Sequence, residues 1–457
     1  MPTAPNTLTT RLFSDFPSIF SSLLSPKQFD QVTAQHRPRG AGIPKLSLWQ
    51  WVMARVYHEF SRSGSFSASV KRVTRVSISD AALSQRAGSI GMRTIEKILP
   101  QVLRPLADKQ SHPEAFYQGY RLVALDGTRF NLRNTAAINA QALKTRCARG
   151  DGEPAFAHLN AVVLVEVGLH QPLGAAVGWE LEGELTLARR VLAETNLPTK
   201  TLLMGDRLFG TPSLLWEQTS MLAQTQSAIL LRVRSNLKAK PVKQLADGSQ
   251  LVEIKVRDAQ TQATLGTLQV REIHAILEYE GDSKPLEVRF WTTLLDAEAY
   301  PASELVALYS ARWEQELFFR ELKSHLHAKA NLLDAQTPET AGQEFLAMLL
   351  AAALVAMQRK EVAAQNGVEV LRISFAKVYH KSSALCELIA HAGDLIPREN
   401  IAILVERIIE ELKTTALIPK RKPRSCPRTV RQPARDWPKT RKYQSKPLIK
   451  TITISNP

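Results

Sequence analysis

One short stretch of the chain concentrates side chains that can do chemistry on phosphates. An α-helix turns by about 100° per residue, so the polar residues of this stretch fall within an arc of about 80° on one helix. They are Tyr309, Arg312, Glu316, Arg320 and Lys323. A carboxylate on such a face can hold a metal ion, and the cations beside it can grip phosphates. The pattern indicates an enzyme that acts on a nucleic-acid backbone.

The stripe also has an ordinary explanation. Arg312 and Glu316 are four residues apart, which is the spacing of ion pairs on solvated helices. Most charged stripes are of this kind. Carboxylates earlier in the chain favour the interpretation of this stripe as a metal- and phosphate-binding face.

Asp126 and Asp206 each follow a short apolar run typical of a buried strand. A single aspartate after a strand is most often a turn former or a helix cap. Two such strand ends together with Glu316 form a more specific set, because carboxylate oxygens suit Mg²⁺ or Mn²⁺. Three carboxylates can hold two such ions for an in-line phosphoryl transfer. A basic residue, Arg207, directly follows Asp206.

The elements around these aspartates predict an α/β layered sheet. We expect strands at 120–128, 159–167, 173–179, 201–205 and 228–233, with helices at 184–196 and from Pro212 onward. The aspartates then lie on the first and fourth strands.

Between residues 235 and 296 the pattern changes to short alternating β-like runs, which predict an all-β insertion. Arg232 leads into this insertion and Trp291 lies near its exit. The polar residues from Tyr309 to Lys323 follow on a helix predicted over 301–326.

The two ends of the core are predicted to be helical. On the N-terminal side we expect helices over 46–60, 79–87 and 94–103, preceded by a loosely helical 12–24. This region is either a reader of DNA ends, with Ser84, Gln85 and Arg86 facing a groove, or an ordinary helical bundle. On the C-terminal side we expect helices over 337–358, 384–392 and 400–412.

The charge and composition point to a polyanionic partner. The 457 residues carry a net charge of +16, which favours nucleic acid through counterion release, although a merely basic soluble protein has the same sign. From Pro419 on, the chain is rich in Lys, Arg and Pro, and is either a DNA-contacting or a solubilising tail. Cysteines without metal-ligand spacing and the lack of an apolar leader predict a reducing cytosol. The longest apolar run, 346–357, is short for a membrane span and predicts a helix buried against the Glu316 helix.

The spacing Tyr309-x2-Arg312-x3-Glu316-x6-Lys323 resembles the Y-R-E-K signature of bacterial insertion-sequence DDE transposases of the insertion-sequence-four type. Asp126 in Leu-Asp-Gly-Thr resembles the first catalytic aspartate of that family, and Asp206 in Gly-Asp-Arg-Leu-Phe-Gly resembles the second. The resemblance covers roughly residues 46–437. Arg320 stands where relatives often carry a lysine, and either side chain can contact a phosphate.

The resemblance implies a ribonuclease-H-like mixed sheet flanked by helices, with an all-β insertion ahead of the helix that carries Glu316. The expected regions are a helical DNA-binding region at 1–112, a catalytic core at 113–234 and 297–360, the β insertion at 235–296, a helical region at 361–418 and a basic tail at 419–457.

The resemblance also implies a mechanism. A homodimer would bind the terminal inverted repeats of its element, cut there, pass through a hairpin and join the 3′ ends to target DNA. Two Mg²⁺ ions, replaceable by Mn²⁺, would be held by Asp126, Asp206 and Glu316. The DNA contacts would come from Tyr309, Arg312, Arg320, Lys323, Arg207, Arg232 and Trp291. Tyr309 would not be a nucleophile.

Trp291 would stack on a flipped base, with a core tryptophan as the alternative.

The expected location is the bacterial cytoplasm, at the nucleoid and away from membranes. A catalytically silent DNA-binding descendant and a ribonuclease-H-like nuclease without strand transfer remain the alternatives for function.

Overall fold

The computed structural model describes residues 11–33, 45–141, 156–179, 182–258, 261–279, 285–326 and 332–419, with 428–429, 440–441 and 449–454 farther on. Packing divides the chain into two compact units. The first comprises Met1–Ala115, Gly127–Asn196 and Leu317–Ile418, and the second comprises Phe116–Asp126, Leu197–Glu316 and Pro419–Pro457. The five regions expected from the sequence stay a prediction.

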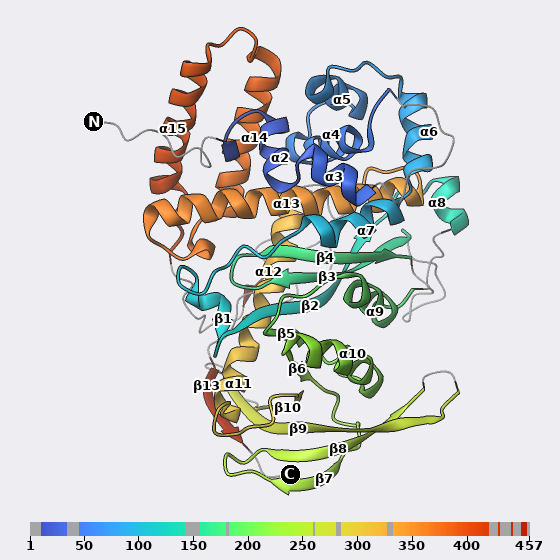
Figure 1. Ribbon diagram of the computed structural model, residues 1–457, viewed down its shortest axis with the longest axis vertical. Helices are drawn as coiled ribbons and strands as arrows, with labels where there is room; N and C mark the ends of the chain where they lie inside the picture. Colours follow the sequence, from blue (N-terminus) through green and yellow to red (C-terminus); the bar gives the residue numbers. More distant parts are fainter. Residues whose placement is uncertain are drawn as a thin grey trace. The chain divides into compact units, whose positions relative to one another are not determined.

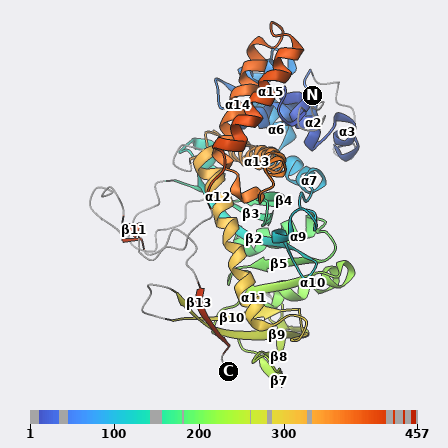
Figure 2. The same cartoon turned by 90° about the vertical axis from the view of Figure 1, so that its left-hand side faces the viewer.

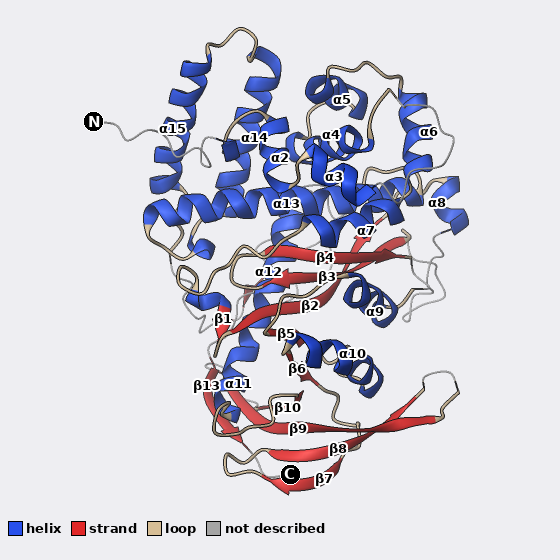
Figure 3. Ribbon diagram, in the orientation of Figure 1, coloured by secondary structure: helices blue, strands red, loops and turns tan. Residues whose placement is uncertain are grey.

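Helices dominate the first unit (Figure 3). Its N-terminal part contains α2 (Phe16–Leu23), α3 (Pro26–Thr33), α4 (Leu48–Ser61), α5 (Phe66–Thr74), α6 (Asp80–Ile90) and α7 (Met92–Val102). Ser79 caps α6 by accepting a hydrogen bond from the Ala82 amide, as its sequence predicts. The loosely helical segment expected near the N-terminus is instead packed, because the Phe16 ring lies edge-on to Tyr57 at 5.0 Å.

The helix α13 (Pro338–Asn366) runs through the core of the first unit. It packs against α4, α7, α14 (Phe375–Ala392) and α15 (Arg398–Thr415), as Figures 1 and 2 show from two sides. It is long and apolar enough to span a membrane, but 89% of its most apolar 18-residue stretch is buried inside the protein. It is longer than predicted, since it ends only at the left-handed Gly367.

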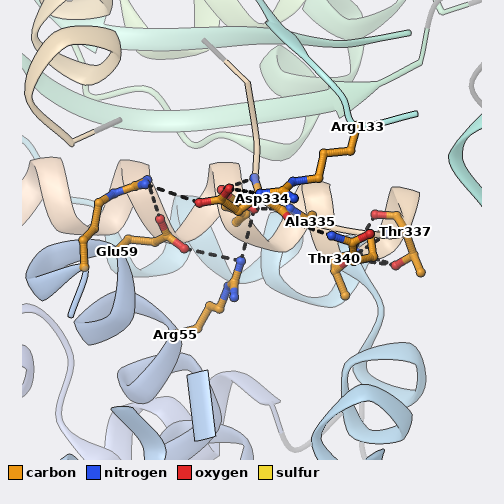
Figure 4. A network of polar contacts seen from close by, with 10 residues as sticks. Arg55, Glu59, Arg133, Asp334, Ala335, Thr337 and Thr340 are labelled. Atoms are coloured by element: carbon orange, nitrogen blue, oxygen red, sulfur yellow. Dashed lines mark hydrogen bonds and ion pairs between the residues drawn. The ribbon is translucent and has the colours of Figure 1, made fainter. Parts of the chain in front are cut away.

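A polar network fixes the chain segment that precedes α13 (Figure 4). Arg55 of α4 and Arg62, which follows its last residue, both contact Glu59, and Arg62 and Arg133 reach Asp334. The carboxylate of Glu344 accepts hydrogen bonds from the backbone amides of Asp334 and Ala335. The network therefore ties α4 to the first turns of α13.

The first unit also contains a β-hairpin and one end of a strand that both units share. The strand order is β4 (Gln171–Gly178), β3 (His158–Glu166) and β2 (Tyr120–Asn131), with α8 (Ala136–Gln141) and α9 (Glu184–Glu194) in the same unit. The buried Glu96 of α7 pairs with Arg190 of α9 at 2.8 Å. These strands and α9 confirm the sequence prediction within a few residues.

The second unit is built on a mixed sheet in the order β2–β5–β6–β10–β9–β8–β7. The strand β5 (Thr201–Gly205) runs parallel to both β2 and β6 (Ala228–Arg232), and α10 (Pro212–Thr225) connects β5 to β6. The other pairings in this order are antiparallel. The mixed sheet with flanking helices confirms the predicted α/β class and is consistent with a ribonuclease-H-like fold.

The segment predicted as a β insertion is all-β in its described residues. It forms β7 (Lys240–Gln244), β8 (Gln250–Arg257), β9 (Thr264–Tyr279) and β10 (Leu286–Thr292). It continues the core sheet, because β10 pairs directly with β6 (Figure 1). The short β1 (Phe116–Tyr117) joins β2, and β13 (Ile449–Ile454) joins β9.

Only short pieces of the predicted basic tail are among the described residues. They are β13 and the paired β11 (Arg428–Thr429) and β12 (Thr440–Arg441). The remaining tail residues, 420–427, 430–439, 442–448 and 455–457, lie outside the described ranges.

The signature segment is helical but is not one regular α-helix, which corrects the sequence prediction. It consists of α11 (Ala302–Tyr309), a 3-10 turn (Ser310–Arg312), α12 (Trp313–Glu321) and a π-helical turn (Leu322–Leu326). A 3-10 residue advances by about 120° and a π residue by less than an α residue. With these steps the five polar residues still fall within an arc of roughly 100°, slightly wider than a constant 100° step predicts.

Glu272 of β9 is a charged group in the core of the second unit, with 3% of its surface exposed. Burial alone would raise its pKa, but hydrogen bonds from His274, Trp291 and Arg289 outweigh this effect and lower the pKa to about 2. Four side chains hold the carboxylate, since Gln250 also donates to it at 3.1 Å.

The variant Glu272→Gln should lose part of the acid dependence of folding. A pKa lowered on folding from 4.5 to about 2 stabilises the fold by about 3 kcal/mol above pH 4.5, and this contribution is lost as the pH falls through 2. Urea unfolding between neutral and acid pH should show a smaller loss for the variant. Glu278→Gln, which changes an exposed carboxyl on the same strand, is the control. Equal acid slopes for Glu272→Gln and wild type would contradict the assignment.

Candidate active site

Strand register brings the two aspartates to neighbouring positions. Leu125 of β2 pairs with Gly205 of β5 in a parallel ladder, so Asp126 and Asp206 each come one residue later. Gly205 in turn pairs with Leu231 of β6, which is followed by Arg232. Residues opposite one another in parallel strands project to the same face. Asp126, Asp206 and the cationic Arg232 therefore occupy equivalent positions on three adjacent strands.

Arg312 lies against the first of these acids. Its Nη1 is 2.7 Å from Oδ2 of Asp126, and the two side chains are only 13% and 12% exposed. Burial alone would lower the pKa of Arg312, but Tyr309, Asp126, Glu316 and Asp206 together raise it. All three predicted catalytic carboxylates thus act on one guanidinium.

Tyr309 holds this arginine in place. Its hydroxyl donates to the carbonyl oxygen of Gly205 at 3.1 Å, and the guanidinium carbon of Arg312 lies 5.7 Å from the ring centroid. Phe290 of β10 packs edge-on against the phenol at 4.8 Å. Burial, above all, raises the pKa of Tyr309 to about 12. The phenol stays protonated at neutral pH and can donate its hydrogen bond.

Asp206 begins a tight turn beside β6. Its Oδ1 accepts a hydrogen bond from the Leu208 amide at 2.8 Å. At Gly210, where the turn meets β6, an added Cβ would lie 2.3 Å from the carbonyl oxygen of Arg232. This turn therefore needs a glycine, and it leaves Arg207 exposed.

Glu316 is exposed on α12 and acts on Arg312 through charge. Among the residues that the structure describes, no three acidic, histidine or cysteine side chains form a group that could hold a metal ion. The oxygen donors themselves suit Mg²⁺ or Mn²⁺. One of these carboxylates, Asp126, is in contact with the Arg312 guanidinium.

The last two residues of the signature belong to the first unit. Arg320 is exposed on α12, and the Nζ of Lys323 lies 5.3 Å from the ring centroid of Phe130. Their roles toward DNA stay predictions.

The second unit contains a basic pocket of about 650 Å³, whose lining includes Arg207, the residue that follows Asp206. We call it the arginine pocket. It is lined by Arg207, Arg232, Val233, Arg234, Ser235, Asn236, His274, Glu287, Val288 and Arg289. The structure thus brings together Arg207 and Arg232, which the sequence had singled out separately. Sequence reasoning missed Arg289 and His274 as pocket residues, although both occur in the β-like runs of the insertion.

Trp291 lies in the core, with 0% of its surface exposed. It pairs with Leu231 on one side and Glu272 on the other, and its indole Nε1 donates to Oε2 of Glu272 at 2.7 Å. This environment corresponds to the core-tryptophan alternative. A base could stack on the ring only if the sheet opened, so the expected base-holding role does not fit this arrangement.

Comparison with known proteins agrees with this geometry. The family model described as the transposase DDE domain matches residues 117–354, a range that contains Asp126, Asp206 and the signature helix. The chain is also 24% identical over 383 residues to the transposase InsG for insertion sequence element IS4 of Escherichia coli strain K12, covering 81% of this chain and 79% of that protein. The chain belongs to the DDE transposase family, of the type represented by the insertion-sequence-four element.

Proposed function

We propose that this transposase cuts an insertion sequence at its terminal inverted repeats and joins the freed 3′ ends to target DNA. The observation that carries this proposal is the placement of Asp126 and Asp206 at the ends of two adjacent parallel strands, with Arg312, four residues before Glu316, in contact with Asp126. Its position inside the matched DDE domain supports the same function.

Asp126, Asp206 and Glu316 would hold two divalent ions, Mg²⁺ or Mn²⁺. Ions bound there would activate an attacking hydroxyl and stabilise the leaving oxygen of a phosphoryl transfer. For this to happen, the Arg312 guanidinium must release Asp126. A terminal DNA phosphate is the natural new partner, because guanidinium binds phosphate in a bidentate manner.

The remaining residues would orient the DNA strand. Tyr309, protonated at neutral pH, would position Arg312 and donate a hydrogen bond without acting as a nucleophile. Arg207 and Arg232 in the arginine pocket would carry the strand beside the carboxylates, and Arg320 and Lys323 would contact phosphates farther along. Trp291 is left out of this set because of its burial.

The N-terminal helices would read the DNA ends, supported by the exposure of Ser84 and Gln85 on α6. A homodimer bound to two terminal repeats, acting at the nucleoid in the bacterial cytoplasm, is the assembly we propose. Hairpin formation between cutting and joining is also part of this proposal. Two rivals, a silent DNA-binding descendant and a nuclease without strand transfer, make different predictions in the same assays.

Replacing Asp126, Asp206 or Glu316 with Ala should each reduce cleavage by about 1000-fold or more, because several kcal/mol of transition-state stabilisation depends on each ligand set. The assay is cleavage of supercoiled DNA that contains the element's ends, in Mg²⁺ or Mn²⁺, and gel shifts should show that end binding persists. Glu298→Ala, an exposed acid in the same unit, should cleave normally.

Near-normal cleavage by one of the three alanine variants would remove that residue from the metal site. A wild type that never nicks DNA would favour the silent descendant. Nicking without products joined to a target plasmid would favour the simple nuclease.

The variant Arg312→Gln should bind Mn²⁺ about tenfold more tightly than wild type in the absence of DNA, since the ion no longer has to displace a buried guanidinium from Asp126. Electron paramagnetic resonance of free Mn²⁺ measures this affinity directly and without catalysis. Arg320→Gln removes the same charge from an exposed site on the signature helix and serves as the control. Equal or weaker Mn²⁺ binding by Arg312→Gln would refute the competition.

A further inference from the structure

Glu272 is the centre of a set of contacts that ends at the wall of the arginine pocket. Its Oε2 accepts hydrogen bonds from Nε of Arg289 at 2.6 Å and from Nε1 of Trp291 at 2.7 Å. Its Oε1 contacts Nε2 of His274 at 2.9 Å and accepts from Gln250. In the β9–β10 ladder, Trp291 lies opposite Glu272 and Arg289 lies opposite His274. Apart from Gln250, which lies on β8, these groups are therefore held by one antiparallel strand pair.

Arg289 passes this fixation on to the chain segment that leaves β6. Its Nη1 donates to the carbonyl oxygens of Leu237 at 2.6 Å and Ser235 at 3.3 Å. The Arg289 carbonyl accepts a hydrogen bond from the Val233 amide at 2.8 Å. The side chain and the backbone of Arg289 thus hold residues 233–237 at both ends. The Arg289 side chain is only 13% exposed.

The segment held in this way carries the exposed polar side chains of the pocket. Arg234, Ser235 and Asn236 are exposed between the two anchored ends. Arg207 and Arg232 face the same pocket, and the only acid among its described lining residues is Glu287. Because Glu272 compensates Arg289, the cations left to meet a ligand are Arg207, Arg232 and Arg234.

We propose that the arginine pocket is a binding site for a DNA backbone phosphate, and that Glu272 is a positioning residue that shapes it through Arg289. Trp291 contributes by orienting the Glu272 carboxylate. This inference rests on the proposed function for the identity of the polyanion. It adds Arg234 as a phosphate ligand, and it gives the buried tryptophan a role that needs no exposed face.

The direction in which Glu272→Gln changes the DNA affinity distinguishes a positioning role of Glu272 from a purely electrostatic one. Removing a negative charge beside a cationic pocket should tighten DNA binding if only Coulomb attraction acts. If Glu272 positions the 233–237 segment, Glu272→Gln should instead weaken binding, by about tenfold, because Arg289 loses its acceptor and the phosphate ligands lose their geometry. Glu287→Gln is the matched control, since it removes the same charge from an exposed, unbraced residue of the same pocket and should bind equally or more tightly.

The measurement is fluorescence anisotropy of the full-length protein with a labelled duplex of about 30 base pairs, in EDTA, over about 0.1–0.4 M NaCl. Arg234→Gln should weaken binding and reduce the salt slope by about one. Arg289→Gln should match Glu272→Gln, and the double variant should be no weaker than either alone. Glu272→Asp should restore part of the affinity.

The proposal is overturned if Glu272→Gln binds as tightly as Glu287→Gln, or if Arg234→Gln keeps the affinity and salt slope of wild type. Should Glu272→Gln fail to fold by circular dichroism, the exposed Arg234→Gln decides alone. Because no metal is present, the outcome is separate from catalysis. If the wild type cleaves DNA but these variants bind DNA as tightly as the wild type, only the pocket proposal is disproved. If the variants bind as expected here but the wild type does not cleave DNA, only the proposed function is disproved.

Discussion

The ion pair between Arg312 and Asp126 is the constraint on which the site depends. Carboxylates gathered in a partly buried place repel one another, by about 4 kcal/mol for a pair 4 Å apart at an effective dielectric constant of 20. A cation must offset this repulsion whenever no metal is bound. The structure supplies one from the signature helix itself, and the other two carboxylates act on the same guanidinium.

Under the proposed function, this arrangement would link the affinity for metal to the affinity for DNA. An entering ion would compete with the Arg312 guanidinium, which contacts the Asp126 carboxylate and lies against the Tyr309 ring. A DNA phosphate that attracts the guanidinium would lower that barrier. By linkage, each ligand then favours the other, and cleavage would be confined to protein already bound at a DNA end.

The sequence predicted the parts of this site that follow local rules. Apolar runs ending in Asp126 and Asp206 indicate strands from local sequence alone, whereas the parallel pairing that places both strand ends together joins segments far apart in the chain. The π-helical turn over Leu322–Leu326 was missed because residue periodicity assumes one helical step throughout. The direct contact of Arg312 with Asp126 was also missed, since spacing along a helix does not reveal a partner on a distant strand.

Trp291 is a second residue whose environment could not be predicted from local sequence. Its place near the end of the insertion suggested a base-stacking role, but its burial depends on β10 pairing with both β6 and β9. Pairing partners of an antiparallel insertion are not readable from one strand. The same pairing creates the contact of Glu272 with Arg289, which no motif announces.

The most direct test of this account is a crystal structure of the protein bound to Mn²⁺ and to a DNA end, with the anomalous signal locating the ions. We expect manganese among Asp126, Asp206 and Glu316, with the Arg312 guanidinium moved from Asp126 onto a terminal phosphate. Manganese bound elsewhere, or bound at these carboxylates while Arg312 still contacts Asp126, would contradict the account.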